Sequence, residues 1–119
     1  MFVDCSKVGV YKSQFGLGVY AKQDIKRGEI VEYGIAYRLK NVDGNENPHL
    51  FTWSDDRTVW CGMSGCVPFY NHSDSPNVKN ERDFVNDTIT YTALKDIKQG
   101  EEIFCRYKSK EWRKCFQEF

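Results

Sequence analysis

The sequence predicts a single, mostly β domain, and three observations support this prediction. Short segments rich in β-branched and aromatic residues recur along the chain and are bounded by turn-forming residues. The apolar spacing of an amphipathic helix is weak almost everywhere. A segment near residue 21 recurs at an offset of 72 residues, each time between two strand-like segments. A chain of 119 residues is long enough for one hydrophobic core, so we expect one domain spanning residues 1–119.

The expected elements are mainly strands. Residues 18–21, 29–33, 35–39 and 88–92 carry the β-branched and aromatic side chains typical of strands. A further strand follows Gly100 and ends at Tyr107. The best helical spacing lies in residues 109–119, where Trp112, Cys115, Phe116 and Phe119 fall on one face. A short helical turn is expected within residues 47–53.

The repeated segment consists of residues 21–29, AKQDIKRGE, and residues 93–101, ALKDIKQGE. Gly28 and Gly100 stand where a tight turn requires positive φ, which glycine adopts without steric cost. Ile25 and Ile97 would anchor the two turns against the core. The repeat indicates a domain built from two related corners, or two unrelated hairpins that share common turn chemistry.

Composition excludes some classes of function. Seventeen basic and seventeen acidic residues cancel, which argues against a protein held on nucleic acid by bulk charge. The chain has no apolar run of about 18 residues, and its first residues lack the apolar core of a signal peptide. We therefore expect a soluble, intracellular protein that binds neither membrane nor nucleic acid directly.

The five cysteines are expected to be free thiols in a reducing compartment. No two of them form a C-x-x-C pair, and Cys61 and Cys66 give only a weak zinc signal because no second pair accompanies them.

Three short motifs carry polar chemistry. Gly16-Leu17-Gly18 opens a strand, where two absent Cβ atoms allow a small molecule to touch the backbone, although a bulge or tight turn gives the same pattern. Asn71-His72-Ser73 lies between the apolar run VPFY and the turn Ser-Pro-Asn at residues 75–77. The third motif is Gly100-Glu101-Glu102 with the strand ending at Tyr107, and Trp112 follows it. Taken singly, His72, Tyr107 and Trp112 are better explained as structural residues.

In this order and spacing, these motifs resemble the SET-domain protein lysine methyltransferases. The resemblance runs from about residue 13 to residue 112 and is nearest to the small stand-alone viral and bacterial type that lacks pre-SET and post-SET modules. It implies several small β-sheets, short helical turns and a knot-like C-terminal segment that passes under the Asn-His-Ser loop. The zinc-binding Cys-x-Cys tail of larger members is absent from this sequence, so no structural metal is expected.

The resemblance implies transfer of a methyl group from S-adenosyl-L-methionine to a lysine ε-amine, with Tyr107 as the catalytic residue. The backbone around the Gly-x-Gly motif would approach the methionine and ribose part of the cofactor. Asn71 would hold the methionine amino group, His72 would contribute backbone contacts to the adenine, and Trp112 would cover the adenine face. The cofactor-binding set is therefore Gly16, Leu17, Gly18, Asn71, His72 and Trp112.

The expected lysine channel departs from the family pattern. His49 stands where close relatives often place a channel tyrosine, so either His49 lines the channel or another aromatic such as Tyr70 does. Cys105 lies two positions before Tyr107, where many members have Phe or Tyr. A small side chain there leaves room for more than one methyl group, which favours di- or trimethylation.

The resemblance implies a histone tail as the substrate. With that substrate, we expect the protein to act in the nucleus or in a host nucleus. Two alternatives stay open: a non-histone substrate, with a cytoplasmic location, and an inactive SET-like module that binds a lysine-containing peptide. A β-rich structural protein with coincidental motifs is a third. The sequence leaves homodimer formation open.

Overall fold

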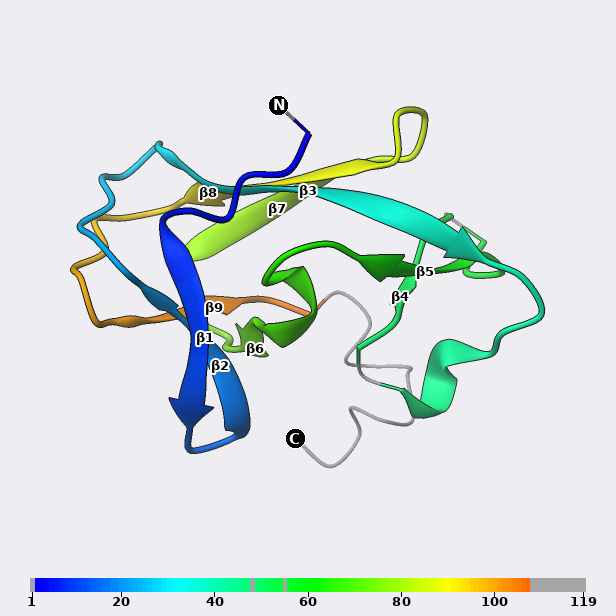
Figure 1. The fold of residues 1–119 in the computed structure, drawn as a ribbon, viewed down its shortest axis with the longest axis horizontal. Coiled ribbons are helices and arrows are strands. Elements are labelled where there is room, and N and C mark those ends of the chain that lie inside the picture. Colours follow the sequence, from blue (N-terminus) through cyan, green and yellow to red (C-terminus); the bar gives the residue numbers. More distant parts are fainter. Residues whose placement is uncertain (1, 48, 55, 108–119) are drawn as a thin grey trace.

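The structure is a computed structural model that describes residues 2–47, 49–54 and 56–107, and it confirms a mostly β fold (Figure 1). The expected helix at residues 109–119 and Trp112 lie outside the described residues. The elements are β1 (Val8–Ser13), β2 (Gly16–Ala21), β3 (Ile30–Leu39), the 3₁₀ helix η1 (Gly44–Glu46), β4 (Phe51–Thr52), β5 (Trp60–Met63), the 3₁₀ helix η2 (Val67–Phe69), β6 (Asn71–His72), β7 (Val78–Asp83), β8 (Thr88–Ala93) and β9 (Glu102–Cys105). Neither 3₁₀ helix in these ranges is long or apolar enough to cross a membrane.

The strands form two sheets. One has the order β1-β2-β9-β6 and the other the order β4-β5-β3-β8-β7. Among the described strands, neighbours pair antiparallel, with the exception of β6 and β9, which pair in parallel. β9, the last described strand, lies between β2 and β6 in its sheet (Figure 1). The expected knot-like passage of the C-terminal segment depends on residues beyond 107, which lie outside the described part of the chain.

The repeated segment forms two equivalent corners that bond to each other. Ile25 and Ile97 exchange backbone hydrogen bonds of 2.8 and 2.7 Å, and both are 1% exposed. Gly28 N–H donates to the carbonyl of Ala93 at 2.9 Å. The equivalent hydrogen bond of the second corner runs from Gly100 N–H to the carbonyl of Ala21 and measures 2.8 Å. The two glycines have φ values of 87° and 89°, as the turn chemistry predicts.

These corners are not hairpins. β2 and β3, which flank the first corner, belong to different sheets, and so do β8 and β9, which flank the second. Each corner therefore carries the chain from one sheet to the other. The two crossings meet at the left of Figure 1, where the blue and orange traces come together.

One expected strand pair is a single strand. Apart from Glu29, the expected strands 29–33 and 35–39 join in the ten-residue β3, which continues through Gly34. A Cβ on Gly34 would lie 3.0 Å from Val67 and 3.1 Å from Ser64, so the missing side chain lets η2 pack against the strand. β3 also contains an irregularity between Ile30 and Glu32, which buries two consecutive side chains, Val31 and Glu32.

Within residues 47–53, where a short helical turn is expected, the structure has a single turn in which Leu50 N–H donates to Asn47 O at 3.2 Å, and no 3₁₀ helix is assigned to its described residues. The 3₁₀ turn lies earlier, at Gly44–Glu46, because the Asp43 side chain caps it by accepting from Asn45 N–H. Phe51 and Thr52 instead pair with β5. Strands β1, β5 and β7 carry weak alternation in the sequence, and their pairing with neighbouring strands supplies the missing stabilisation.

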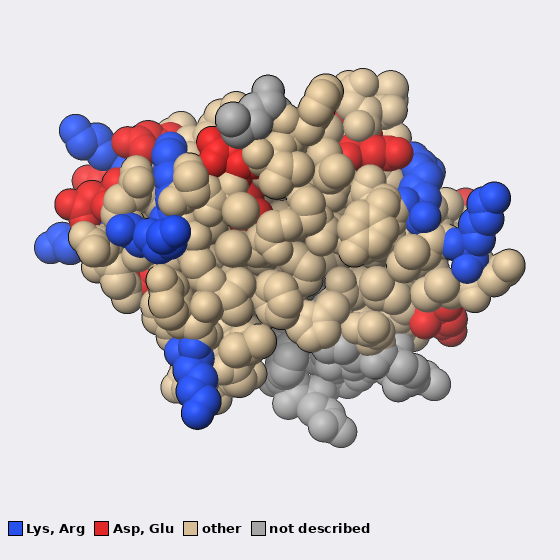
Figure 2. Space-filling view, in the orientation of Figure 1, with Lys and Arg blue, Asp and Glu red and all other residues tan. Residues whose placement is uncertain are grey.

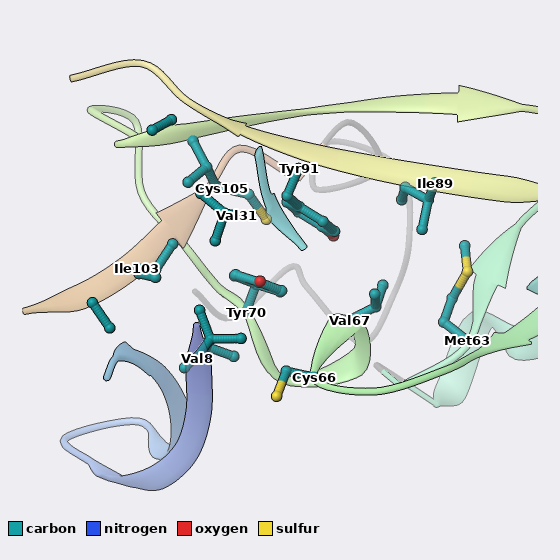
Figure 3. Close-up of a cluster of buried hydrophobic side chains, with 14 of the residues drawn as sticks. Val8, Val31, Met63, Cys66, Val67, Tyr70, Ile89, Tyr91, Ile103 and Cys105 are labelled. Carbon is teal, nitrogen blue, oxygen red and sulfur yellow. The ribbon is translucent and has the colours of Figure 1, made fainter. Parts of the chain in front are cut away.

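The core lies between the two sheets (Figure 3). Ile89 and Tyr91 of β8 contribute from one side and Ile103 and Cys105 of β9 from the other. Tyr70, which directly follows η2, enters the middle of this cluster and stacks on Tyr91 with ring centroids 4.3 Å apart. The polar loop that begins at Asn71 is therefore tied directly to the core.

On the face drawn in Figure 2, lysine and arginine side chains are interspersed with acidic ones toward the two ends, and the middle of the face carries few charges. No broad patch of one sign covers this face, which agrees with the balanced formal charge of the chain.

Candidate active site

The loop after β6 is anchored along β9. Ser73 N–H donates to the carbonyl of Cys105 at 3.0 Å. Asn77, which is only 7% exposed, completes the edge of β9 with its side chain: its Oδ1 accepts from Phe104 N–H at 2.8 Å and its Nδ2 donates to Glu102 O at 3.0 Å. The side chain of a buried asparagine thus supplies hydrogen bonds to the β9 backbone of the kind that a neighbouring strand supplies. Residues 71–77 and β9 therefore form one hydrogen-bonded unit.

Asn71 connects this unit to the Gly-x-Gly motif. Its Nδ2 donates to Leu17 O at 2.9 Å and to a Glu102 carboxylate oxygen at 2.9 Å, with Ser13 Oγ at 3.3 Å. No group in the described ranges donates to Asn71 Oδ1, so that oxygen is available as an acceptor. The two motifs, 54 positions apart, meet at this side chain.

Close packing against neighbouring side chains requires glycine at position 18. A Cβ at this position would lie 2.6 Å from a Glu102 carboxylate oxygen and 2.9 Å from Asn71 Nδ2. Gly16 differs, because its φ of 102° requires glycine while the space around its absent Cβ is open. The sequence interpretation of two glycines beside a small molecule therefore fits Gly16 better than Gly18.

Tyr107 is fixed at two points. Its hydroxyl donates to Tyr70 O at 2.6 Å, and its backbone N–H donates to His72 Nδ1 at 2.8 Å. Because Nδ1 accepts, the proton of a neutral His72 lies on Nε2, which is 3.0 Å from Asp74 Oδ1. The His72 side chain is 9% exposed and its ring packs against that of Tyr107 at a centroid distance of 5.2 Å. Sequence reasoning gave His72 only backbone contacts, and the structure adds this side-chain contact with Tyr107.

A buried carboxylate stands behind Tyr70. Glu32 is 1% exposed, accepts from Tyr70 OH at 2.7 Å and from Cys66 N–H at 2.9 Å, and burial raises its pKa to about 7. Sequence reasoning missed this residue because the period-two pattern of β3 breaks at the irregularity that turns Glu32 inward. At 2% exposure, the ring of Tyr70 offers no open surface to a substrate in this structure.

The other channel residues lie near the same loop. His49 is exposed, its ring packs against Phe69 of η2 at 5.3 Å, and its Nδ1 lies 3.3 Å from Pro68 O. Cys105 is 4% exposed, and burial raises the pKa of its thiol to about 12. The structure therefore brings together the Gly-x-Gly motif, Asn71-His72 and Tyr107, with His49 at the end of η2, whereas Trp112 lies outside the described residues.

Glu102 is a second residue that sequence reasoning missed. One of its carboxylate oxygens accepts from Asn71 Nδ2 and the other from Tyr20 OH at 3.1 Å. Burial and Glu102 raise the pKa of Tyr20 above its usual value. The acidic group places negative charge beside Gly18 and Asn71, so the arrangement suits a ligand group that carries positive charge.

A family model described as the SET domain matches residues 16–108. The chain belongs to the SET-domain family. The matched region contains the Gly-x-Gly, Asn-His-Ser and Gly-Glu-Glu motifs, and the expectation drawn from them is confirmed at the level of the family.

Two curated relatives of this SET domain are histone-lysine N-methyltransferases. One, EZH2 of Chaetomium thermophilum, is 33% identical over 111 residues, an alignment that covers 77% of this chain. The chain spans only 7% of the length of that relative. The other, from Schizosaccharomyces pombe and specific for H3 lysine-37, is 26% identical over 105 residues, with 82% of this chain and 69% of the relative covered.

Solved structures show the same fold. A Plasmodium falciparum protein assigned as a histone methyltransferase superposes with a TM-score of 0.69 at 28% identity, covering 86% of this chain and 97% of that one. Chaetomium thermophilum polycomb repressive complex 2, bound to S-adenosylmethionine in an autoinhibited conformation, contains a chain that matches with a TM-score of 0.70 at 25% identity. That match covers 89% of this SET domain and 16% of the larger chain.

Proposed function

We propose that this SET domain is an S-adenosyl-L-methionine-dependent protein-lysine N-methyltransferase that acts on a histone tail. The observation that supports the activity is the meeting of Asn71, the Gly-x-Gly motif and Tyr107 along β9. Both curated relatives are histone-lysine N-methyltransferases, which supports a histone substrate for this domain. A histone substrate would place the activity in a nucleus.

The residues present fit the charged groups of S-adenosyl-L-methionine. A cofactor ammonium requires acceptors, and Asn71 Oδ1 and the Glu102 carboxylate supply them beside the backbone of Leu17 and Gly18. When bound, the cofactor supplies the methyl group and a positive sulfonium. We assign Gly16, Leu17, Gly18, Asn71 and His72 to its binding, and Trp112 to the adenine face.

The chemistry requires a neutral lysine amine. With a free pKa of about 10.4, deprotonation at pH 7 costs about 4–5 kcal/mol. Burial in a narrow channel and a nearby positive charge lower that pKa, since both disfavour the ammonium form. In-line placement of the amine then contributes most of the remaining acceleration.

Tyr107 orients the amine in this proposal and does not serve as the base. Its hydroxyl proton is directed to Tyr70 O at 2.6 Å, so we assign its oxygen the role of acceptor from an N–H of the amine. Two fixed points hold that oxygen in place. Cys105 leaves room beside the amine, so we propose that products reach two or three methyl groups, which mass spectrometry of the modified tail would test.

The decisive experiment incubates the full chain with labelled S-adenosyl-L-methionine and recombinant histones, and maps the modified lysine. Tyr107→Phe is expected to lose about 10²-fold or more in turnover while its cofactor affinity stays within a few-fold. Tyr37→Phe, on an exposed tyrosine of β3, is the matched control and should keep wild-type turnover. Wild-type turnover by Tyr107→Phe would refute the assignment.

Calorimetry separates this proposal from an inactive peptide-binding module. A cofactor present at 100 times its Kd stabilises the native state by about 2.7 kcal/mol and raises the melting temperature. A domain that binds a lysine peptide but shows no such shift would favour the inactive module. Cofactor binding with methyl transfer only to a protein other than histone would retain the chemistry and change the substrate.

A further inference from the structure

Three potential metal ligands converge outside the residues assigned to methyl transfer. Cys5 lies in the segment before β1, Glu32 in the irregular part of β3, and Cys66 immediately before η2. The two thiol sulfurs and a Glu32 oxygen all lie within 4.8 Å of one another. Glu32 and Cys66 are buried, and Cys5 is half-buried.

We propose that Cys5, Glu32 and Cys66 form a binding site for a divalent cation of the zinc class. Two thiolates and one carboxylate make a ligand set that prefers zinc over magnesium or calcium, which favour oxygen alone. A tetrahedral ion would take its fourth ligand from water, on the side where Cys5 reaches the surface.

The carboxylate is already oriented as a metal ligand would be. Tyr70 OH and Cys66 N–H each donate to a different oxygen of Glu32, at 2.7 and 2.9 Å. Such outer hydrogen bonds fix the direction of a ligating carboxylate and leave one lone pair on each oxygen for the ion. Gly65 has a φ of 57°, and a side chain at this position would collide with Glu32 and touch Cys5. The backbone is therefore shaped to admit the three groups.

Charge supports the same inference. No ion pair among the described residues includes Glu32. Asp4 adds further negative charge near Glu32. A bound divalent cation would offset the negative charge of these carboxylates.

The sequence could not reveal this set. Spacing alone paired Cys66 with Cys61, but Cys61 is a fully buried residue of β5 whose charged neighbours are Arg82, Asp87 and Arg38. The ligands proposed here come from three segments separated by more than 25 residues each. An ion would bind the N-terminal segment, β3 and η2 together, directly behind Tyr70.

The test uses the full chain, reduced and stripped of metal by a chelator, and titrated with Zn²⁺ against a colorimetric competitor. We expect one equivalent of Zn²⁺ that persists through gel filtration and raises the melting temperature by about 5 °C. Co²⁺ in its place should give the thiolate charge-transfer absorption and the intense visible bands of a tetrahedral site.

Variants identify the ligands. Cys5→Ser changes a half-buried residue and should weaken Zn²⁺ binding at least about 10-fold without unfolding the protein, and Cys66→Ser should do the same. Cys61→Ala is the control and should bind one equivalent. Sub-stoichiometric Zn²⁺ on the reduced wild type, wild-type affinity in Cys5→Ser, or a Cys5–Cys66 disulfide in place of two alkylatable thiols would each overturn the proposal.

Discussion

The contact between His72 and Tyr107 can be tested with a pair of substitutions. In His72→Ala the Tyr107 N–H loses its acceptor, Nδ1, at 2.8 Å. In His72→Asn the amide Oδ1 is the same number of bonds from the backbone as Nδ1, so it can accept that hydrogen bond. The two variants differ mainly in whether Tyr107 keeps its backbone anchor.

The expected size of the effect follows from this hydrogen bond. An unsatisfied buried donor costs about 1–3 kcal/mol, and because Tyr107 N–H is only partly buried we take the lower half of that range. This corresponds to about a 10-fold loss in the population of the oriented Tyr107. Loss of ring packing between His72 and Tyr107 adds to it in both variants.

The assay combines turnover with hydrogen exchange at the Tyr107 amide. We expect His72→Ala to lose about 10-fold or more in kcat and a similar factor in amide protection. His72→Asn should retain protection and stay within a few-fold of wild type in kcat. Equal loss of protection in both variants, or full protection in His72→Ala, would refute the role given to Nδ1.

Three further predictions concern other parts of the structure. Gly28→Ala and Gly100→Ala should each destabilise the protein by about 1–2 kcal/mol in urea denaturation, because alanine is strained at the φ near 90° that both positions have. The space around each Cβ is open, so no steric clash adds to this cost. A neutral result at one position would show that the corners are not equivalent. Gly18→Ala should weaken S-adenosyl-L-methionine binding by more than 10-fold in calorimetry, because its Cβ would displace Asn71 and Glu102; unchanged affinity would refute the role given to these two residues. Hydrogen bonds from Arg38 and Trp53 lower the pKa of Asp87, so their contribution to stability is present above pH 3.8 and is lost as pH falls through the lower folded pKa. Asp87→Asn should therefore be less stable than wild type at pH 7, with the difference shrinking in acid; a constant difference would contradict this.

Much of the fold follows from local signals in the sequence. β8 alternates buried Ile89, Tyr91 and Ala93 with half-buried threonines, and this pattern predicts a strand on its own. The two corner glycines were equally readable from turn chemistry. β7, with the polar sequence VKNERD, becomes a strand because it pairs along the whole length of β8. Such pairing is a tertiary effect that a local pattern does not contain.

The candidate site divides in the same way. Asn71, His72 and Tyr107 were found because their motifs have fixed local spacing. Glu102 and Glu32 were missed because their importance depends on partners 31 and 38 residues away, Asn71 and Tyr70. A charged residue in a strand looks like a solvent-facing position unless its partner is known.

The mutual bonding of the two corners has a consequence for how the protein acquires its structure during synthesis. The first corner cannot satisfy its backbone until residues 93–101 have left the ribosome, since Ile97, Ala93 and Glu101 supply its partners. Contacts spanning some 70 residues dominate this junction, and topologies with such distant contacts fold slowly. A nascent chain halted before residue 93 should accordingly present an unpaired β2 edge to chaperones and proteases, and the strand that completes the sheet is also the one that leads to Tyr107.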